Sequence, residues 1–399
     1  MPNANHYDML KHDVIIVGAG PAGISTALHL ANLAPELVPR TLILEKARHP
    51  RPKLCGGGIL PDAEVVLCHL GLDITEVPHV DVDWAHFDYD GKGMTMRGEK
   101  KGLFAFRVIR RHEFDAWLAA KARERGFIIH ENTAVKSITA TETGVVVTTD
   151  QGEYHAAVVV GADGSNSVVR RAIIPHEDLH VARLLEIVTE PKPEKSFHKQ
   201  SDSYFDFVVV PQGIQGYVWD FPAVEKGKPV RVRGIYDSNA LSFKADVPLA
   251  FALDEEFGRH GLHLSDYKLE GAPIRWFDAK SDFSAPRVLL VGDAAGVDAL
   301  FGEGISIALG YGGFAAQAIQ DAFTKKDFSF RGYKRSILQA ELGKALRWRT
   351  WFAKFFYSLR SARFQAFVWR KMGWFIEWAV RAFFIEWTRR QEKHKRADI

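Results

Sequence analysis

Three short segments of the chain place glycine or aspartate directly after an apolar run, where ligands bind in open α/β sheets. The first segment, Gly18-Ala-Gly20-Pro-Ala22-Gly23, follows the apolar run Asp13–Val17. Gly18 permits a tight turn, Gly20 lets the main chain approach a pyrophosphate, and Gly23 allows close helix–strand packing. The N–H groups at the start of the next helix would meet the phosphates. The segment predicts a dinucleotide site that includes Ala22.

An acidic residue ends the next apolar run, Thr41–Glu45, 22 residues after Gly23. The carboxylate of Glu45 can accept both ribose hydroxyls, and it disfavours a 2′-phosphate. We therefore assign Glu45 and its neighbour Lys46 to the cofactor site, and we expect FAD or NAD rather than NADP as the tightly bound nucleotide.

The other two segments each end in an aspartate paired with a glycine. Val158–Gly164 ends in Asp163-Gly164, and Val288–Gly296 contains Gly292-Asp293. Both segments resemble the DG and GD motifs of the p-hydroxybenzoate hydroxylase-like flavoprotein superfamily. That resemblance implies FAD, with Asp293 at the flavin ribitol and Asp163 near the pyrophosphate and nicotinamide.

Further residues fit the same superfamily. Arg111, in Arg111-His-Glu-Phe-Asp115, matches the start of a helix whose arginine reaches the flavin side of the cofactor, although a solvated helix-end cation remains an alternative. Val135 lies where the superfamily sets main chain against adenine. Gly302-Glu-Gly304 opens a later helix, whose N–H groups would face the electron-rich end of the flavin and stabilise the charge of its reduced form.

A second glycine run carries a thiol. The segment Pro50–Gly58 reads PRPKLCGGG, so Gly56 and Gly57 allow the main chain to pass close to a planar ring, and Cys55 would lie at the mouth of the site. A structural role for Cys55, as a small residue in a tight loop, is the alternative, because a thiol is a poor acid unless its pKa is tuned.

An aromatic motif, Tyr217-Val-Trp219-Asp-Phe221-Pro222, follows later in the chain. The three aromatic residues alternate, so they project from one face of a strand. They predict an aromatic wall for a long apolar ligand, and an ordinary sheet core is the alternative.

The KxCGGG loop and the YxWxFP motif together resemble the geranylgeranyl reductase family, over roughly residues 10–340. This resemblance implies flavin-dependent saturation of isoprenoid double bonds, with hydride from the reduced flavin and a proton donor to complete the addition. NAD(P)H or a small electron-transfer protein would reduce the FAD. Cys55 would lie near the alkene, and Tyr217, Trp219, Phe221 and Pro222 would shape a channel for an apolar or prenyl-lipid substrate.

One stretch departs from the family pattern. Members often place an Asn-Pro pair before the Gly-x-Gly helix, whereas this chain has Val297-Asp-Ala-Leu-Phe301. A monooxygenase or halogenase of the same fold, acting on an aromatic or polyketide-like substrate, is therefore the second hypothesis. A non-catalytic flavin-binding scaffold at a membrane is the third. No residue is assigned to a metal.

These residues must be positioned by at least two kinds of sheet. The strand–helix–strand order of residues 13–45 predicts a parallel, Rossmann-like α/β domain. We assign residues 1–80, 105–180 and 282–340 to this FAD-binding domain. Residues 81–104 and 181–281, which are rich in strand-like runs and turns, would form an inserted antiparallel-sheet substrate domain.

The C-terminal segment 341–399 differs in charge and composition from the rest of the chain. It carries 14 Lys and Arg against 5 Asp and Glu, whereas the whole chain has a net charge of +3. Six of the ten tryptophans lie between Trp348 and Trp387, interleaved with arginine and phenylalanine. Such amphipathic helices favour an anionic membrane interface. Packing over the flavin domain is the alternative, and no motif for nucleic acid accompanies them.

Two cysteines and an N-terminus, Met1–Lys11, without an apolar signal-peptide core predict a cytoplasmic protein. No uncharged apolar stretch reaches the ~18 residues of a membrane-spanning helix. We therefore expect at most peripheral contact, at the cytoplasmic face of a membrane.

Overall fold

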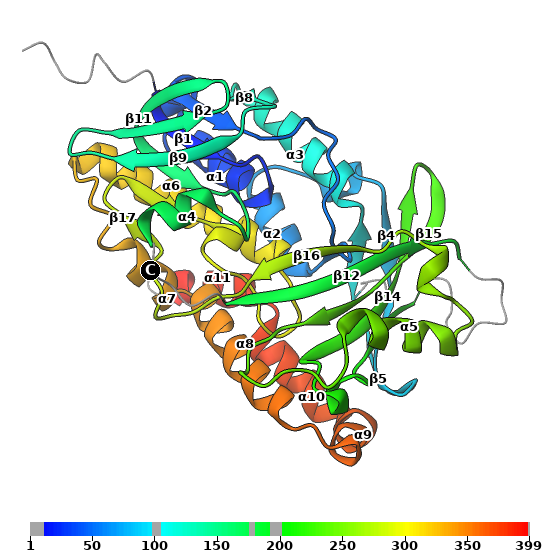
Figure 1. Ribbon diagram of the computed structural model, residues 1–399. Helices are drawn as coiled ribbons and strands as arrows, with labels where there is room; N and C mark the ends of the chain where they lie inside the picture. The colour runs from blue at the N-terminus through cyan, green and yellow to red at the C-terminus, as the bar shows by residue number, and fades with distance from the viewer. Residues whose placement is uncertain (1–11, 98–104, 175–179, 192–201, 398–399) are drawn as a thin grey trace, which may run out of the picture.

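The computed structural model describes residues 12–97, 105–174, 180–191 and 202–397. Two large sheets lie next to one another, and the C-terminal helices run along the lower side of the molecule (Figure 1). The domain assignments made for residues 1–11 and 98–104 concern residues that the structure does not describe.

The first sheet is built around parallel strands. Within the described residues its main path runs β17-β18-β11-β1-β2-β8, and β1 pairs in parallel with both β2 and β11. The antiparallel strands β9 and β10 extend it from β11. Its strands are β1 (His12–Val17), β2 (Thr41–Leu44), β8 (Ile128–His130), β9 (Val135–Ala140), β10 (Val145–Thr149), β11 (Gly152–Gly161), β17 (Ser284–Ala285) and β18 (Val288–Leu290).

Helices cover the parallel strands, which explains why these strands are apolar on both faces. The covering helices are α1 (Pro21–Leu33), α3 (Arg111–Glu124), α4 (Val168–Ile173) and α6 (Ile305–Lys325). The hydroxyl of Ser25 on α1 donates to the carbonyl of Leu309 on α6 at 2.6 Å. Gly312 makes this approach possible, because a Cβ there would lie 2.3 Å from the Ser25 hydroxyl. The predicted parallel β-α-β unit and the predicted helix near Gly304 are confirmed.

The second sheet is antiparallel except where β13 pairs with β5. Its order in the described residues is β16-β12-β15-β14-β13-β5-β6. Its strands are β5 (Trp84–Tyr89), β6 (Lys92–Arg97), β12 (Val181–Thr189), β13 (Ser203–Asp206), β14 (Gly216–Glu225), β15 (Lys228–Asp237) and β16 (Glu270–Arg275), and α5 (Leu249–Arg259) accompanies them. Strand β13 ends at Asp206, and a 3-10 turn begins at Val210, next to Pro211, which has no N–H to donate to a neighbouring strand.

A small third sheet was not predicted. It joins β3 (Gly58–Ile59), β7 (Phe106–Ile109) and β4 (His79–Val82). Strand β4 spans the proposed domain boundary at residues 80 and 81, and the division into domains stays a prediction.

The C-terminal segment is helical throughout most of its described length. Its elements are α8 (Glu341–Ser358), α9 (Ala362–Lys371), α10 (Gly373–Ala379), a π-helical turn (Val380–Phe384) and α11 (Trp387–Ala397), and α7 (Tyr333–Gln339) precedes them. It packs on the body of the protein. The carboxylate of Asp62, on α2 (Pro61–His69), accepts hydrogen bonds from the N–H groups of Glu386 and Thr388 at 2.7 and 2.9 Å. None of the described helices is long and apolar enough to cross a membrane.

Candidate active site

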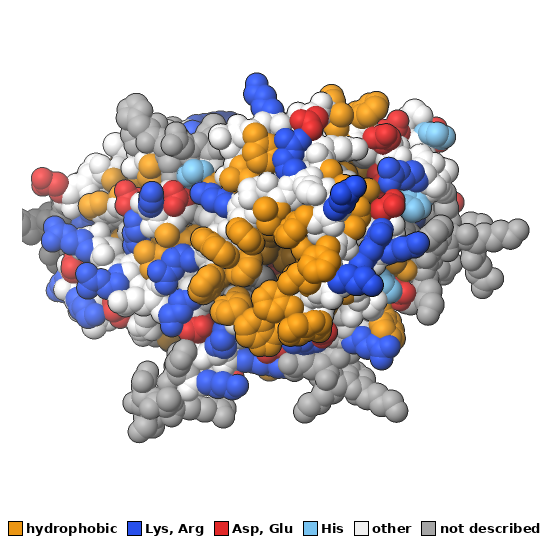
Figure 2. All heavy atoms as spheres, turned by 90° about the horizontal axis from the view of Figure 1, so that it is seen from below, with side chains coloured by type: hydrophobic (Ala, Val, Ile, Leu, Met, Phe, Trp, Pro, Cys, Tyr) orange, Lys and Arg blue, Asp and Glu red, His pale blue; other side chains and the backbone are white. Residues whose placement is uncertain are grey.

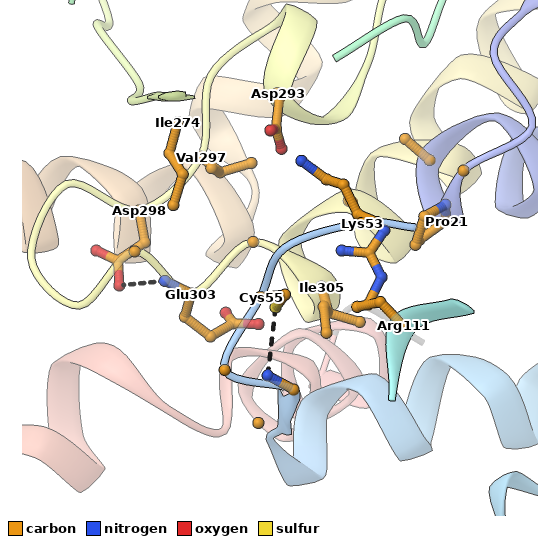
Figure 3. Close-up of a pocket in the computed structure, with 18 of the residues that line it drawn as sticks. Pro21, Lys53, Cys55, Arg111, Ile274, Asp293, Val297, Asp298, Glu303 and Ile305 are labelled. Atoms are coloured by element: carbon orange, nitrogen blue, oxygen red, sulfur yellow. Dashed lines mark hydrogen bonds between the residues drawn. The ribbon is translucent and has the colours of Figure 1, made fainter. Parts of the chain in front are cut away.

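A cavity of about 790 Å³ is lined by residues from both large sheets and from the C-terminal segment. Figure 3 shows Lys53, Cys55 and Arg111 in the same space as Asp293 and Glu303. Most residues that the sequence assigned to the cofactor and substrate line this cavity: Gly18, Gly20, Ala22, Glu45, Lys46, Cys55, Gly56, Gly57, Arg111, Val135, Asp163, Gly164, Tyr217, Trp219, Phe221, Asp293, Gly302 and Gly304.

Three of the assigned residues do not line the cavity. Pro222 is buried on the opposite face of β14 from Phe221, because side chains alternate along a strand, and it lines a separate small hollow. Gly23 and Gly292 instead permit close packing: a Cβ on Gly23 would lie 2.0 Å from the Gly18 carbonyl oxygen, and one on Gly292 would lie 2.7 Å from the Ala22 side chain. The structure therefore does not bring Pro222 together with the other residues proposed for the substrate channel.

The glycine turn between β1 and α1 forms one end of the cavity. Gly18 has φ +108°, and a Cβ there would lie 2.3 Å from the carbonyl oxygen of Ala162, so the turn needs glycine. Gly20 is the N-cap of α1 and faces the cavity. The first N–H groups and the positive end of the helix dipole are thus available to an anionic group.

Glu45 is buried beside this turn. Its carboxylate accepts hydrogen bonds from the main-chain N–H groups of Ala19 and Ala47 at 2.9 and 3.0 Å. Arg51 lies 3.3 Å from Glu45 and 3.4 Å from Asp115, and it lines the cavity. Sequence reasoning missed Arg51, whose position depends on two acids from separate elements. A carboxylate has about four acceptor positions, so Glu45 keeps capacity for ribose hydroxyls.

The two aspartates at the strand ends have different partners. Asp163 caps α4, because its carboxylate accepts from Ser167 Oγ at 2.5 Å and from the Val168 N–H at 2.6 Å. Burial raises the pKa of Asp163, although these hydrogen bonds oppose the shift. Asp293 accepts from Ser165 Oγ at 2.9 Å, and Figure 3 shows Lys53 pointing toward it. Asp293 and Lys53 therefore offer polar groups of both signs within the cavity.

Arg111 is buried, so it is not a solvated cation. Its Nε and Nη2 donate to the two carboxylate oxygens of Asp115 at 2.8 and 3.0 Å. Burial opposes the charge, but the Asp115 carboxylate outweighs this effect and raises the pKa of Arg111. The guanidinium stays charged and held in one orientation at the cavity wall.

The Cys55 loop packs against the aromatic wall of β14. A Cβ on Gly56 would lie 3.0 Å from the Phe221 ring and 3.2 Å from Trp219 Nε1. Cys55 is half-buried and is not in a disulfide, and its Sγ accepts from the Gly57 N–H at 3.4 Å. The thiol and the aromatic wall thus share one end of the cavity.

The aromatic wall is both a sheet core and a cavity lining. Tyr217, Trp219 and Phe221 are each no more than 6% exposed, and all three line the cavity. Phe205 lies 4.9 Å from Phe221 and 5.3 Å from Tyr217 between ring centroids. This end of the cavity is apolar and suits a hydrocarbon ligand.

One end of the cavity is polar and the other is apolar, and this arrangement fits FAD. Helix α1, Glu45 and Arg51 provide donors and acceptors for an adenosine diphosphate at one end, and the Cys55 loop and the aromatic residues of β14 line the other end. Bound FAD would supply hydride chemistry where the cavity meets Cys55.

Comparison with known proteins agrees with this cofactor. A family model described as FAD binding domain matches residues 11–301, and the chain belongs to that family. Digeranylgeranylglycerophospholipid reductase of Thermoplasma acidophilum is 27% identical over 377 residues, which cover 87% of each chain. The chain is an FAD-dependent oxidoreductase of the geranylgeranyl reductase type.

Two solved structures share the fold. A geranylgeranyl bacteriochlorophyll reductase-like protein of Thermoplasma acidophilum superposes with a TM-score of 0.77 at 22% identity, covering 96% of this chain and 99% of that protein. The halogenase PltM in complex with phloroglucinol and FAD superposes with a TM-score of 0.68 at 17% identity, covering 90% of this chain and 79% of that one. At these identities the likeness concerns the fold alone.

Proposed function

We propose that the protein reduces carbon–carbon double bonds of an isoprenoid, geranylgeranyl-type lipid. The observation that supports this most is the placement of the Cys55 thiol beside the apolar wall of Tyr217, Trp219 and Phe221 in the same cavity as the cofactor residues. Reduced FAD would supply the hydride. NAD(P)H or a small electron-transfer protein would be its transient donor.

The side chains of the cavity have separate tasks in this proposal. The aromatic wall holds the prenyl chain and excludes water. Cys55 lies where the alkene would be reduced and is proposed to donate the proton. Arg111 keeps a positive charge at a fixed place in the wall, because its Nε and Nη2 both donate to Asp115.

An anaerobic assay tests the reaction. Purified protein with FAD, dithionite and a digeranylgeranyl phospholipid in detergent should give products with added hydrogen, measured by mass spectrometry. Cys55→Ser should slow the reduction at least about tenfold while FAD stays bound, because a serine hydroxyl is a much weaker acid. Cys68→Ser is the matched control, since Cys68 is exposed and does not line the cavity.

One result would contradict the reductase proposal, and another would contradict only the proposed role of Cys55. Absence of lipid reduction together with oxygen-dependent hydroxylation or halogenation of an aromatic compound would favour the second hypothesis. Unchanged turnover of the Cys55→Ser variant would remove Cys55 from the chemistry and leave the reductase proposal intact.

We propose further that the C-terminal helices dock on an anionic membrane surface. Of nine exposed large hydrophobic residues in the described part of the chain, seven form what we call the aromatic patch: Trp348, Trp351, Phe355, Phe367, Trp374, Phe375 and Trp378. Figure 2 shows hydrophobic side chains gathered on this face with lysine and arginine around them. Exposed basic residues of the same helices are Arg347, Lys354, Arg363, Arg370 and Lys371.

The aromatic patch adjoins the cavity. Trp378 lies 5.7 Å from Phe383 between ring centroids, and Val380, Arg381 and Ile385 line the cavity. Aromatic side chains prefer the headgroup level, and basic residues are attracted to anionic lipid. A lipid substrate could therefore enter from the bilayer without crossing water.

Vesicle sedimentation tests the docking surface. The wild-type protein should pellet with vesicles that contain phosphatidylglycerol, and the Trp374→Ser/Trp378→Ser variant should stay in the supernatant. Phe251→Ser, on α5, is the control, because Phe251 is equally exposed but lies outside the aromatic patch. Failure of the wild-type protein to pellet with these vesicles would exclude this docking surface.

A further inference from the structure

Helix α8 presents three buried residues in a row to the interior. Arg349, Ala353 and Tyr357 are spaced four residues apart, so they share one helix face, and each is at most 1% exposed. A fully buried arginine is rare unless it is paired. Arg349 and Tyr357 both contact the segment Val297–Gly304, which we call the cofactor loop because it contributes to the cavity wall (Figure 3).

Arg349 contacts two carboxylates of the cofactor loop. Its Nη1 lies 3.4 Å from Asp298 Oδ2 and 3.1 Å from Glu303 Oε2. Two neighbouring carboxylates buried without a cation would be strongly destabilising, because each has lost its hydration. Burial raises the pKa of Glu303, and the charge of Arg349 opposes that shift.

Asp298 shapes the cofactor loop directly. It is fully buried, and its carboxylate accepts hydrogen bonds from the N–H groups of Leu300 and Phe301 at 2.7 and 3.1 Å. Glu303 fixes the end of the loop, since it accepts from the N–H and the hydroxyl of Ser306 at 2.8 and 2.7 Å. These bonds close the turn that leads into α6.

Three tyrosine hydroxyls hold the carbonyl groups of the same loop. Tyr357 of α8 donates to Leu300 O at 2.6 Å. From β14, Tyr217 donates to Phe301 O at 2.5 Å. From β15, Tyr236 donates to Ala299 O at 3.0 Å. Helix α8 and two strands of the second sheet thus all donate hydrogen bonds to the cofactor loop.

We propose that Arg349 is a positioning residue for the flavin, which acts through Asp298 and Glu303 to keep the cofactor loop in one conformation. The inference rests on FAD binding and does not depend on which substrate is reduced.

Substitution of the arginine tests the proposal in the full-length protein. Arg349→Met removes the charge and keeps most of the side-chain volume. Arg347→Met is the matched control, because Arg347 lies on the same helix but is exposed. The double variant Asp298→Asn/Arg349→Met removes one buried acid together with its cation. The readouts are the FAD dissociation constant and the reduction potential of the bound flavin.

We expect Arg349→Met to bind FAD at least about tenfold more weakly than the control. Its flavin potential should shift to a more negative value, because a positive charge has left the cavity wall. The double variant should bind FAD with an affinity between that of Arg349→Met and that of the wild type. If Arg349→Met alone does not fold, the double variant should still fold and bind FAD more weakly than the wild type.

Three results would overturn the proposal. The first is an Arg349→Met variant with the affinity and potential of the Arg347→Met control. The second is a double variant with wild-type values, which would mean that the loop keeps its shape without Arg349. The third is a double variant that binds FAD no better than a folded Arg349→Met, which would mean that charge compensation is not the cause.

Discussion

Glu186 is a buried carboxyl behind the Cys55 loop that none of the roles above uses. It lies on β12, is 2% exposed, and its Oε2 has no hydrogen-bond partner among the described residues. Burial raises the pKa of Glu186 to about 7, and the Arg110 guanidinium, 3.9 Å away, opposes the shift only in part. The group therefore titrates near neutral pH, next to the loop that carries the thiol.

This pKa predicts a pH dependence of stability. Because the folded-state pKa lies above the ordinary value of 4.5, the folded protein holds the proton more tightly than the unfolded chain. Stability from Glu186 is fully present below about pH 4.5 and is lost as the pH rises to about 7, by roughly 3 kcal/mol. Glu186→Gln should remove this part of the pH dependence in urea unfolding between pH 5 and 8.

Glu270→Gln is the control for that measurement, since Glu270 is the register partner of Glu186 on β16. An unfolding free energy of Glu186→Gln that fell between pH 5 and 8 as steeply as that of the wild type would contradict the assignment.

The role of a residue could be predicted from the sequence where it depends on a single turn. It could not be predicted where it depends on partners far away in the chain. Gly18 and Gly20 are recognisable because the turn that needs them is local. Arg349 has no local signal, because its carboxylate partners lie 51 and 46 residues earlier in the chain, on the cofactor loop.

At the scale of elements, the glycine loop beside β3 shows how one short segment can depend on its neighbours. Gly57 has φ +82°, and a Cβ there would lie 2.1 Å from the Ile109 carbonyl oxygen. The Cβ position of Gly56 meets side chains at 3.0 Å, and that of Gly58 meets the Phe106 ring at an ordinary 3.5 Å. The three adjacent glycines thus have different tolerances.

Alanine substitutions should rank in that order. Gly58→Ala should be nearly neutral, Gly56→Ala should cost about 1 kcal/mol of stability, and Gly57→Ala should cost about 3 kcal/mol or more, because both the backbone and the carbonyl oppose it. Thermal unfolding and FAD fluorescence measure the effects. A Gly57→Ala variant as stable as Gly58→Ala would show that the loop relaxes freely.

Apolar runs and helical periodicity predicted the main elements well, including β1, α1 and α6. The third sheet escaped prediction because β3 has two residues and β4 has four, too few for a pattern. Its pairing is also non-local, since Gly58 is opposite Val108.

At the scale of the whole molecule, one cavity depends on most of the chain. Its lining begins at Val17 and ends at Arg389, and it includes both large sheets. A ligand in it would contact the parallel sheet through Gly20 and the antiparallel sheet through Trp219. FAD should therefore stabilise the protein as a unit.

Removal of the cofactor tests this coupling. Free FAD at one hundred times its dissociation constant should raise the unfolding free energy of the deflavinated protein by about 2.7 kcal/mol. FMN should stabilise less at equal concentration, because it lacks the adenosine half that the turn at Gly18 and the acid Glu45 would bind. A midpoint of unfolding that did not change with FAD concentration would contradict the coupling.

The contribution of residues 380–389 to the cavity wall has a consequence for biosynthesis. The glycine turn and its strands leave the ribosome early, but the wall is incomplete until Arg389 and its neighbours have emerged and docked on Asp62. We expect a nascent chain arrested before residue 341 to hold FAD poorly, even though every glycine motif is already present. Cofactor loading would then follow synthesis and serve as a check that the chain has been made through its C-terminal helices.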